Sequence, residues 1–349
     1  MKVARLYDFL DIRIEEMPVP AIGPGEALVR ARACGICSGD VVPWYIRKKA
    51  PLVFGHEPVG EIVAVGAGVT AFHPGDRVFV HHHAPCFRCR ACARGEFVQC
   101  PVWKQSQIDP GGMAEFFRVP AINLSGDTLR LPDHVSDEDG ALVEPLACVV
   151  KSLDRAGAVK GASVLIIGLG VMGQMHVLLA RHLGARQILA ADLVASRGAK
   201  ALALGADVAI DASAGDLAEQ VRAHTDGDGA EVVIAGPATI AAIEQGLACA
   251  ARGGTVVQFM GTEPGETLAL SMFDFYFREL RLVPSYSCGP VETRRALELI
   301  GGGVVRAAHV VTHRFPLAQA ADAYRVAAFD KQAIKTLVTF GAAASGTAA

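Results

Sequence analysis

The sequence predicts an α/β protein in which a doubly wound parallel sheet is joined to a second, β-rich domain. Three observations support this prediction: an apolar run that breaks at a glycine-rich turn, a series of strand-like runs with helical patterns between most of them, and the length. With 349 residues, 51% of them apolar, the chain is long enough for two domains, each with a core of its own.

The glycine-rich turn carries the strongest local signal. Residues 164–167 are typical of a strand buried on both faces, and Gly168, Gly170 and Gly173 follow in the pattern G-x-G-x-x-G. This pattern gives a tight turn, leaves the backbone open to a pyrophosphate and packs helix against strand. A helix beginning near Val171 and Met172 would direct its unpaired N–H groups and its positive dipole end at that pyrophosphate.

Two further features favour a dinucleotide-binding domain over a chance glycine turn. The apolar run Ile188–Ala191 ends in Asp192, nineteen residues after Gly173, near the ~20-residue offset at which an acidic residue binds the ribose hydroxyls. Strand-like runs then follow, which makes six parallel-strand candidates in total. These later runs are 207–210, 231–235, 255–260 and 280–283.

Composition excludes several classes of function. The net charge of −3 gives no reason to expect binding to nucleic acid or to an anionic membrane. Charges occupy the first residues where a signal peptide would need its apolar core, and no apolar run approaches the ~18 residues of a spanning helix. We therefore expect a soluble, cytoplasmic protein.

Six of the nine cysteines lie between Cys34 and Cys100, a clustering that favours metal over disulfides in such a protein. Four of them form a C-x2-C-x2-C-x7-C run, too close together to join distant elements. Four thiolates at this spacing predict a closed tetrahedral zinc site, with a pair of disulfides as the alternative. The four are Cys86, Cys89, Cys92 and Cys100.

The first part of the chain offers other candidate ligands. The pair Cys34 and Cys37 has no partner pair within reach, so we expect only one of them to be a ligand. His56 and Glu57 are adjacent in a glycine-flanked loop, and Glu144 precedes a proline within an apolar helix predicted at about Ser136–Leu153. A buried carboxylate needs a partner, either a metal or an ion pair.

A row of three histidines, 81–83, continues a predicted strand. Strand alternation would place His81 and His83 on one face and His82 on the other. Such a row is more often a partly buried edge than a metal site. The last part of the chain, after the dinucleotide unit, is too short to fold alone and is expected to return to the first domain.

Taken together, these residues resemble the zinc-dependent medium-chain alcohol dehydrogenase family over essentially the whole chain. Glu144-Pro145 and the segment 192–197 are most similar to the sorbitol (polyol) branch. His83, three residues before Cys86, is similar to a histidine near the substrate of threonine dehydrogenases. The matching motifs are Cys37 after Cys34-Gly35-Ile36, Gly55-His56-Glu57, the four cysteines, Gly112-x-Ala114-Glu115-Phe116, Glu144-Pro145-Leu146, the glycine turn and Asp192-Leu193-x-Ala195-x-Arg197.

The resemblance implies two domains with the active site in the cleft between them. The first is a GroES-like catalytic domain formed by residues 1–155 and completed by residues 289–349. The second is a Rossmann domain formed by residues 156–288. The resemblance also implies a catalytic zinc on Cys37 and His56, with Glu57 or Glu144 completing the protein ligands. Asp40 would orient the ligand histidine from behind. Relatives form dimers or tetramers through the Rossmann sheet edge, here near 259–277.

The cofactor expected from the resemblance is NAD. Asp192 would bind two ribose hydroxyls and repel the 2′-phosphate of NADP. Arg197 could accommodate that phosphate, but a basic residue at this offset also occurs in relatives that use NAD.

This sequence departs from its relatives at the proton relay. Gly39 stands where relatives carry Ser or Thr, Val42 stands where some carry His, and the serine is one residue early, at Ser38. We therefore expect the substrate proton to leave through water and Glu57 or Glu144, with Ser38 assisting.

The expected activity is hydride transfer between NAD and a secondary alcohol or ketone, with a polyol-like substrate favoured and a 2-amino-3-hydroxy acid as the alternative. Cys37, His56 and Glu57 argue against a zinc-free reductase of the same superfamily. A non-catalytic NAD-binding protein descended from such enzymes is the alternative of another class.

Overall fold

The computed structural model describes residues 1–341, which form two compact units. Unit 1 comprises residues 1–147 together with the chain from Cys288 onward, and unit 2 comprises residues 148–287. The domain boundaries drawn from the sequence, at 155/156 and 288/289, lie near these divisions and stay predictions. Among the described residues, none of the helices is long and apolar enough to cross a membrane.

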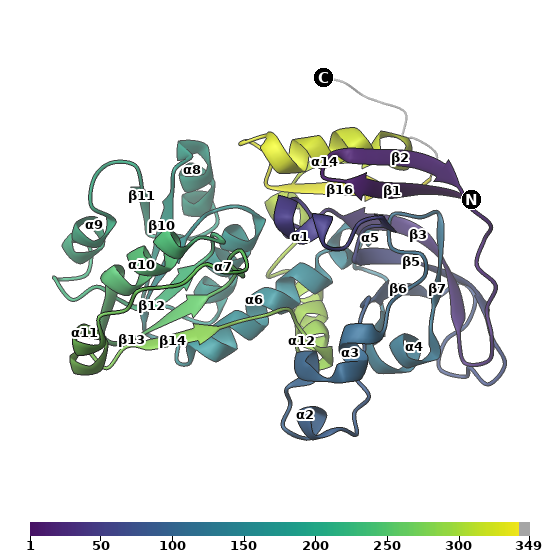
Figure 1. The fold of residues 1–349 in the computed structure, drawn as a ribbon, viewed down its shortest axis with the longest axis horizontal. Coiled ribbons are helices and arrows are strands. Elements are labelled where there is room, and N and C mark those ends of the chain that lie inside the picture. Colours follow the sequence, from purple (N-terminus) through teal and green to yellow (C-terminus); the bar gives the residue numbers. More distant parts are fainter. Residues whose placement is uncertain (342–349) are drawn as a thin grey trace. The chain divides into compact units, whose positions relative to one another are not determined.

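Unit 2 contains a six-stranded sheet in which every pairing is parallel (Figure 1). The strand order is β11-β10-β9-β12-β13-β14, so the chain moves outward from β9 first in one direction and then in the other. The strands are β9 (Ser163–Ile167), β10 (Gln187–Asp192), β11 (Val208–Asp211), β12 (Ala230–Ala235), β13 (Ala250–Gln258) and β14 (Arg281–Pro284). This is the doubly wound sheet that the apolar runs predict.

Helices follow the strands of unit 2, and α7 (Val171–His182), α8 (Ala195–Ala203) and α10 (Ile240–Cys249) pack directly against them. Helices α9 (Leu217–Ala223) and α11 (Met272–Phe277) follow β11 and β13. All five residues of β9 are buried, because helices cover both faces of a parallel sheet, and the one polar residue, Ser163, is hydrogen-bonded to Glu231. The core includes Leu165, Leu189, Val233, Leu247 and Val256.

Unit 1 is built on a seven-stranded sheet of order β15-β16-β3-β5-β6-β8, with β7 paired to β3, and on a three-stranded sheet of order β2-β1-β4. Apart from the parallel pair β15 and β16, these pairings are antiparallel. The strands are β1 (Lys2–Asp8), β2 (Asp11–Glu16), β3 (Ala27–Gly35), β4 (Leu52–Val53), β5 (Glu57–Val65), β6 (Arg77–Val80), β7 (Phe116–Val119), β8 (Thr128–Arg130), β15 (Val311–Pro316) and β16 (Lys335–Thr339).

The chain from Cys288 onward completes unit 1. Strand β16 pairs with β3, joining Leu337 to Gly35, Val338 to Cys34 and Thr339 to Ala33. Helix α14 (Ala320–Phe329) packs on β16 and also on β2, as Figure 1 shows. The other helical segments of the returning chain are α12 (Pro290–Gly301), α13 (Ala307–Val310) and the 3₁₀ turn η2 (Leu317–Gln319).

The helix predicted over Ser136–Leu153 is in fact two helices, α5 (Asp137–Gly140) and α6 (Val143–Ala156). Ser136 caps α5 by accepting a hydrogen bond from the Asp139 N–H. Pro145 lies in the first turn of α6, where a missing N–H costs nothing, whereas a single continuous helix would place this proline in its interior. The break therefore follows from Pro145.

The four-cysteine run forms a lobe that projects from unit 1 (Figure 1). It contains α2 (Arg90–Ala93), the 3₁₀ turn η1 (Phe97–Gln99) and α3 (Pro101–Gln105). Its buried core consists only of Cys92, Val98, Cys100 and Trp103. The remaining helices of unit 1 are α1 (Pro43–Arg47) and α4 (Ala121–Asp127).

Candidate active site and metal centres

The structure brings three of the predicted metal ligands together in unit 1. The sulfur of Cys37, a ring nitrogen of His56 and a carboxylate oxygen of Glu57 all lie within 4.8 Å of one another. Cys37 follows β3, and Glu57 begins β5, the strand that pairs with β3, with Gly35 opposite Glu57. Neighbouring antiparallel strands therefore deliver the ligands. A thiolate, an imidazole and a carboxylate form a donor set that suits zinc.

Glu57 is completely buried, and its charge is balanced by Lys335. The Lys335 Nζ lies 2.5 Å from Glu57 Oε2 and also donates to the carbonyl of Ile36 at 3.0 Å. Burial lowers the pKa of Lys335, but the negative charges of Glu57, Cys37 and Glu144 together outweigh burial and hold the pKa above its usual value. Glu57 Oε1 is buried and has no hydrogen-bond partner among the described residues. An orphaned carboxylate oxygen in this position fits a metal ion.

Asp40, to which the resemblance gives the role of orienting a ligand histidine, lies next to His56. His56 Nδ1 is 3.2 Å from Asp40 Oδ2, and the Asp40 side chain is almost fully buried. Burial lowers the pKa of His56, but the negative charges of Asp40 and Cys37 outweigh it and hold the pKa well above the usual range. The surroundings of His56 therefore favour positive charge, whether a proton or a metal ion supplies it.

Glu144, the alternative carboxylate, is not part of this group. Its carboxylate lies within 4.8 Å of a ring nitrogen of His81 and the sulfur of Cys288, and all three residues are buried. Its negative charge still contributes to raising the pKa of Glu57, after the larger effect of burial and against the attraction of Lys335. The geometry therefore favours Glu57 over Glu144 as the carboxylate that accompanies Cys37 and His56.

Cys34, the unused member of the cysteine pair, is fully buried under the sheet, and burial raises its pKa to about 12. A thiol held neutral in this way is a poor metal ligand. Ser38 is exposed beside Cys37, and both residues line a small cavity with Val41 and Ala333.

The expectation that the histidine row continues the strand is wrong, but the sidedness expected for it holds, because the rings of His81 and His83 both lie beside Trp103, at 6.2 and 4.2 Å. Strand β6 ends at Val80, so His81–His83 lie beyond the pleated strand. The rings of His82 and His83 are 3.9 Å apart, closer than those of His81 and His83 at 6.4 Å. His82 lies 4.9 Å, ring to ring, from His56, while the ring of His83 contacts Trp103 and its Nδ1 bonds to the carbonyl of Ser106 at 2.5 Å.

The four lobe cysteines converge as the spacing predicts, with all four sulfur atoms within 4.8 Å of one another. Cys89 and Cys92 are 3.5 Å apart and Cys86 and Cys100 are 3.6 Å apart, distances typical of thiolates around one tetrahedral zinc rather than of disulfides. A zinc ion here would replace the apolar core that the lobe lacks.

In unit 2 the glycine turn has the geometry that the motif requires. Gly168 has φ +86°, and a Cβ on Gly173 would lie 2.0 Å from the carbonyl oxygen of Gly168. A Cβ on Gly170 would meet nothing within 4 Å. Because the backbone at Gly170 is open and α7 begins at Val171 and Met172, the helix N-terminus can receive a pyrophosphate.

Asp192 ends β10 beside this turn. Its two carboxylate oxygens accept hydrogen bonds from the N–H groups of Leu169 at 2.6 Å and Val194 at 2.8 Å, and Arg197 lies 4.0 Å away. Asp192 therefore fixes the turn in addition to the ribose-binding role predicted for it.

Sequence reasoning missed two features of unit 1. Lys335 is a single charge in a strand that is otherwise apolar or hydroxylated, and a charge in such a strand signals a buried partner. The group of His81, Glu144 and Cys288 carries no such signal, because its members come from three distant segments.

Comparisons with known proteins agree with this geometry. Residues 23–132 match the family described as the alcohol dehydrogenase GroES-like domain, and residues 171–301 match the family described as zinc-binding dehydrogenase. These are the two domain types that the resemblance implies.

Individual relatives match along nearly the whole chain. A sorbitol dehydrogenase of Gallus gallus is 32% identical over 328 residues, covering 90% of this chain and 89% of the relative. An L-threonine 3-dehydrogenase of Symbiobacterium thermophilum is 37% identical over 316 residues, covering 88% of each. A zinc-binding dehydrogenase from Sinorhizobium meliloti, solved with bound NADP, has a TM-score of 0.87 and 31% identity, covering 97% of this chain and 98% of that one. The chain therefore belongs to the zinc-dependent medium-chain alcohol dehydrogenase family and is a zinc- and nicotinamide-dependent oxidoreductase, with a GroES-like and a Rossmann domain.

Proposed function

We propose that this enzyme transfers a hydride between NAD(H) and a secondary alcohol or ketone of the polyol type. The observation that carries the proposal is the grouping of Cys37, His56 and Glu57 within 4.8 Å in unit 1. The sorbitol dehydrogenases among its relatives support the choice of a substrate with several hydroxyl groups.

Cys37, His56 and Glu57 would hold the catalytic zinc, and the buried, unpaired oxygen of Glu57 fits that role. A zinc ion there supplies Lewis-acid activation of the substrate hydroxyl. Asp40 Oδ2 lies 3.2 Å from Nδ1 of His56 and would hold the imidazole on that side, which would leave Nε2 as the ligand atom. Burial raises the pKa of Glu57, and the charge of Lys335 opposes this effect and so favours the ionised carboxylate that a metal ion needs.

We propose NAD rather than NADP as the cofactor. Asp192 places a carboxylate at the end of β10, where it would bind ribose hydroxyls and repel a 2′-phosphate. Arg197, 4.0 Å from Asp192, is already engaged by that carboxylate.

A 2-amino-3-hydroxy acid is the second candidate substrate. The threonine dehydrogenase of Symbiobacterium thermophilum is 37% identical to this chain. His83 supports this candidate as well, because its Nδ1 is held by the Ser106 carbonyl, which leaves Nε2 free of that bond.

A single assay separates these candidates. The purified enzyme is mixed with a panel of secondary alcohols, polyols and 2-amino-3-hydroxy acids, with NAD and NADP in parallel, and formation of the reduced cofactor is followed by absorbance. We expect turnover of polyols with NAD. Cofactor binding without turnover of any compound would favour a non-catalytic NAD-binding protein.

Cys34 and Cys37 provide a matched pair of variants for this assay. Cys37→Ala should lose one zinc ion per chain and its turnover, because it removes a ligand. Cys34→Ala, three residues earlier, should keep its zinc, because Cys34 lies outside the ligand group. Equal zinc contents in the two variants would contradict the assignment.

We also propose that the enzyme is a homodimer or homotetramer. Helix α11, within the sheet-edge segment expected to pair, exposes four large apolar residues, each at least 58% exposed: Met272, Phe273, Tyr276 and Phe277. Such a patch is typical of an interface between chains. The double variant Phe273→Asp with Phe277→Asp should be monomeric by light scattering, whereas Leu202→Asp, at an isolated exposed leucine, should keep the wild-type mass.

We also propose a cytoplasmic location, because the cysteines are present as free thiols. All nine cysteines are free of disulfides, which is usual in a reducing compartment.

A further inference from the structure

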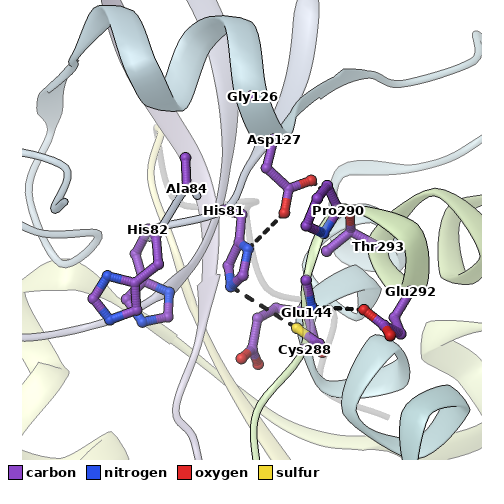
Figure 2. A network of polar contacts seen from close by, with 12 residues as sticks. His81, His82, Ala84, Gly126, Asp127, Glu144, Cys288, Pro290, Glu292 and Thr293 are labelled. Atoms are coloured by element: carbon purple, nitrogen blue, oxygen red, sulfur yellow. Dashed lines mark hydrogen bonds and ion pairs between the residues drawn. The ribbon is translucent and has the colours of Figure 1, made fainter. Parts of the chain in front are cut away.

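A second group of ligand-type side chains lies in unit 1, apart from Cys37, His56 and Glu57. His81 follows β6, Glu144 belongs to the first turn of α6, and Cys288 lies two residues before the start of α12. One ligand atom from each lies within 4.8 Å of the others, and the three residues are at most 5% exposed. Figure 2 shows the Cys288 sulfur and the Glu144 carboxylate on the side of the His81 ring opposite Asp127.

His81 is oriented by a chain of two further buried residues. Asp127 Oδ2 accepts the His81 Nδ1 proton at 2.7 Å, and Asp127 Oδ1 accepts from the Thr293 hydroxyl at 2.5 Å. This bond fixes the tautomer, because a proton on Nδ1 leaves the lone pair of Nε2 directed at Cys288. Metal-binding histidines almost always donate their other N–H to a carboxylate or carbonyl in this way.

We propose that His81, Glu144 and Cys288 form a further zinc site, distinct from the catalytic centre and from the four-cysteine lobe. His81 Nε2 and Cys288 Sγ are 3.8 Å apart, close to the separation of about 3.6 Å that tetrahedral zinc with ordinary Zn–N and Zn–S bonds requires. The carboxylate provides the third donor.

The charges of the group also suit a divalent ion. A thiolate on Cys288 and a carboxylate on Glu144 together neutralise Zn²⁺, and the carboxylate of Asp127, bonded to the far side of the His81 ring, adds a further negative charge that favours a cation. A cation matters because negative charge buried this deeply without one would be costly. The thiol proton of Cys288 is released to solvent when the ion binds, as for any cysteine ligand.

The position of the group in the chain suggests what such an ion does. The chain leaves unit 1 after Ala147, three residues beyond Glu144, and returns at Cys288. An ion bound by Glu144 and Cys288 would tie the departing segment to the returning one and anchor both to His81 at the end of β6. The role expected of such an ion is structural, because it would join the two segments at which the chain leaves and re-enters unit 1.

The competing interpretation is a hydrogen-bonded cluster without metal. The Cys288 thiol is within reach of both His81 Nε2 and the carbonyl oxygen of Glu144, each at 3.8 Å. Counting metal ions separates the two interpretations, because the metal-free cluster leaves two zinc ions per chain and the proposed site makes three.

The experiment measures zinc per chain by mass spectrometry in the full-length enzyme after equilibration with Zn²⁺ and desalting. We expect three ions in the wild type, two in Cys288→Ala and three in the control Cys249→Ala, whose buried cysteine lies in unit 2 outside every ligand group. Equal counts in the wild type and Cys288→Ala would overturn the proposal, whatever the total.

Cysteine variants could fail to fold, so a second experiment counts the metal sites in the wild type alone. The protein is loaded with ¹¹³Cd²⁺, and each bound ion is observed as a cadmium-113 NMR resonance. Three resonances are expected, and the absence of any resonance beyond those of the lobe and the catalytic centre would refute the site. The difference between the wild type and Cys288→Ala is independent of the proposed dehydrogenase activity, because it uses no substrate and the catalytic ion is common to both proteins. Loss of turnover in Cys37→Ala, with the Cys288-dependent ion retained, would show that the two centres are separate.

Discussion

At the scale of single residues, the catalytic centre depends on a glycine. Glu57 and Lys335 meet directly against the backbone of Gly35, where a Cβ would lie 1.7 Å from Glu57 Oε2 and 2.8 Å from Lys335 Cε. Gly35 is also paired across the sheet with both Glu57 and Leu337, so the backbone cannot move aside without breaking the sheet.

Gly35→Ala should therefore expel the Glu57 carboxylate from its place. Separating a buried ion pair costs about 3–5 kcal/mol, so we expect a loss of unfolding free energy of this size in urea titrations, together with the loss of one zinc ion. Gly261→Ala is the control, because a Cβ there meets nothing within 4 Å. A Gly35→Ala enzyme with wild-type stability and zinc content would contradict this account of the site.

Replacing Ser38 tests whether this serine takes the place of the proton-relay hydroxyl that relatives carry one residue later, where this chain has Gly39. The side chain is exposed beside Cys37, so solvent can take the proton in its place. Ser38→Ala should lower kcat/KM by less than about 10-fold, well short of the 10²-fold or more expected for a positioned acid–base group. The measurement is steady-state turnover of the best substrate from the panel. A loss above 10²-fold would identify Ser38 as the relay.

At the scale of elements, a buried histidine joins two helices of unit 2. His176 of α7 bonds through Nδ1 to the Met172 carbonyl at 2.7 Å and through Nε2 to the Ser152 hydroxyl of α6 at 2.6 Å. Burial lowers the pKa of His176 to about 4, and the Met172 carbonyl only partly opposes this effect. The packing of α6 against α7 therefore favours the neutral form of the His176 side chain.

This lowered pKa predicts how stability depends on pH. Between pH 6.5, where the unfolded histidine titrates, and about pH 4, the unfolded chain binds the additional proton. The stabilisation is complete above pH 6.5 and is lost as the pH falls, by about 3 kcal/mol in total. The unfolding free energy of the wild type minus that of His176→Gln should decline over this window, and a flat difference would contradict the assignment.

Prediction from sequence succeeds for elements whose signal is local. The six strands of unit 2 are continuous apolar runs, and the four lobe cysteines are close in sequence, so both are recognised without tertiary information. The helix break before Pro145 was missed because the apolar pattern continues across it. Lys335 and Cys288 could not be paired with Glu57 and Glu144, because each pair is joined only when the last part of the chain returns to unit 1.

At the scale of the whole molecule, the two units differ in how the chain builds them. Unit 2 is one continuous segment, and its six-stranded sheet and apolar core lie entirely within residues 148–287. Unit 1 is discontinuous, because its sheet includes β15 and β16 from the returning chain. Folding of unit 1 therefore requires contacts between residues more than 300 positions apart, such as Gly35 with Leu337.

Two fragments test this difference. Residues 143–287, which keep α6 intact, should unfold cooperatively in urea and bind NADH, seen as a change in its fluorescence, because the glycine turn and Asp192 lie inside the fragment. Residues 1–147 should not fold, because β3 would expose the edge that β16 covers and Glu57 would be buried without Lys335. Adding a peptide of residues 288–341 to the second fragment should restore cooperative unfolding. A folded 1–147 fragment, or a 143–287 fragment that fails to bind NADH, would show that the two units are not built in this way.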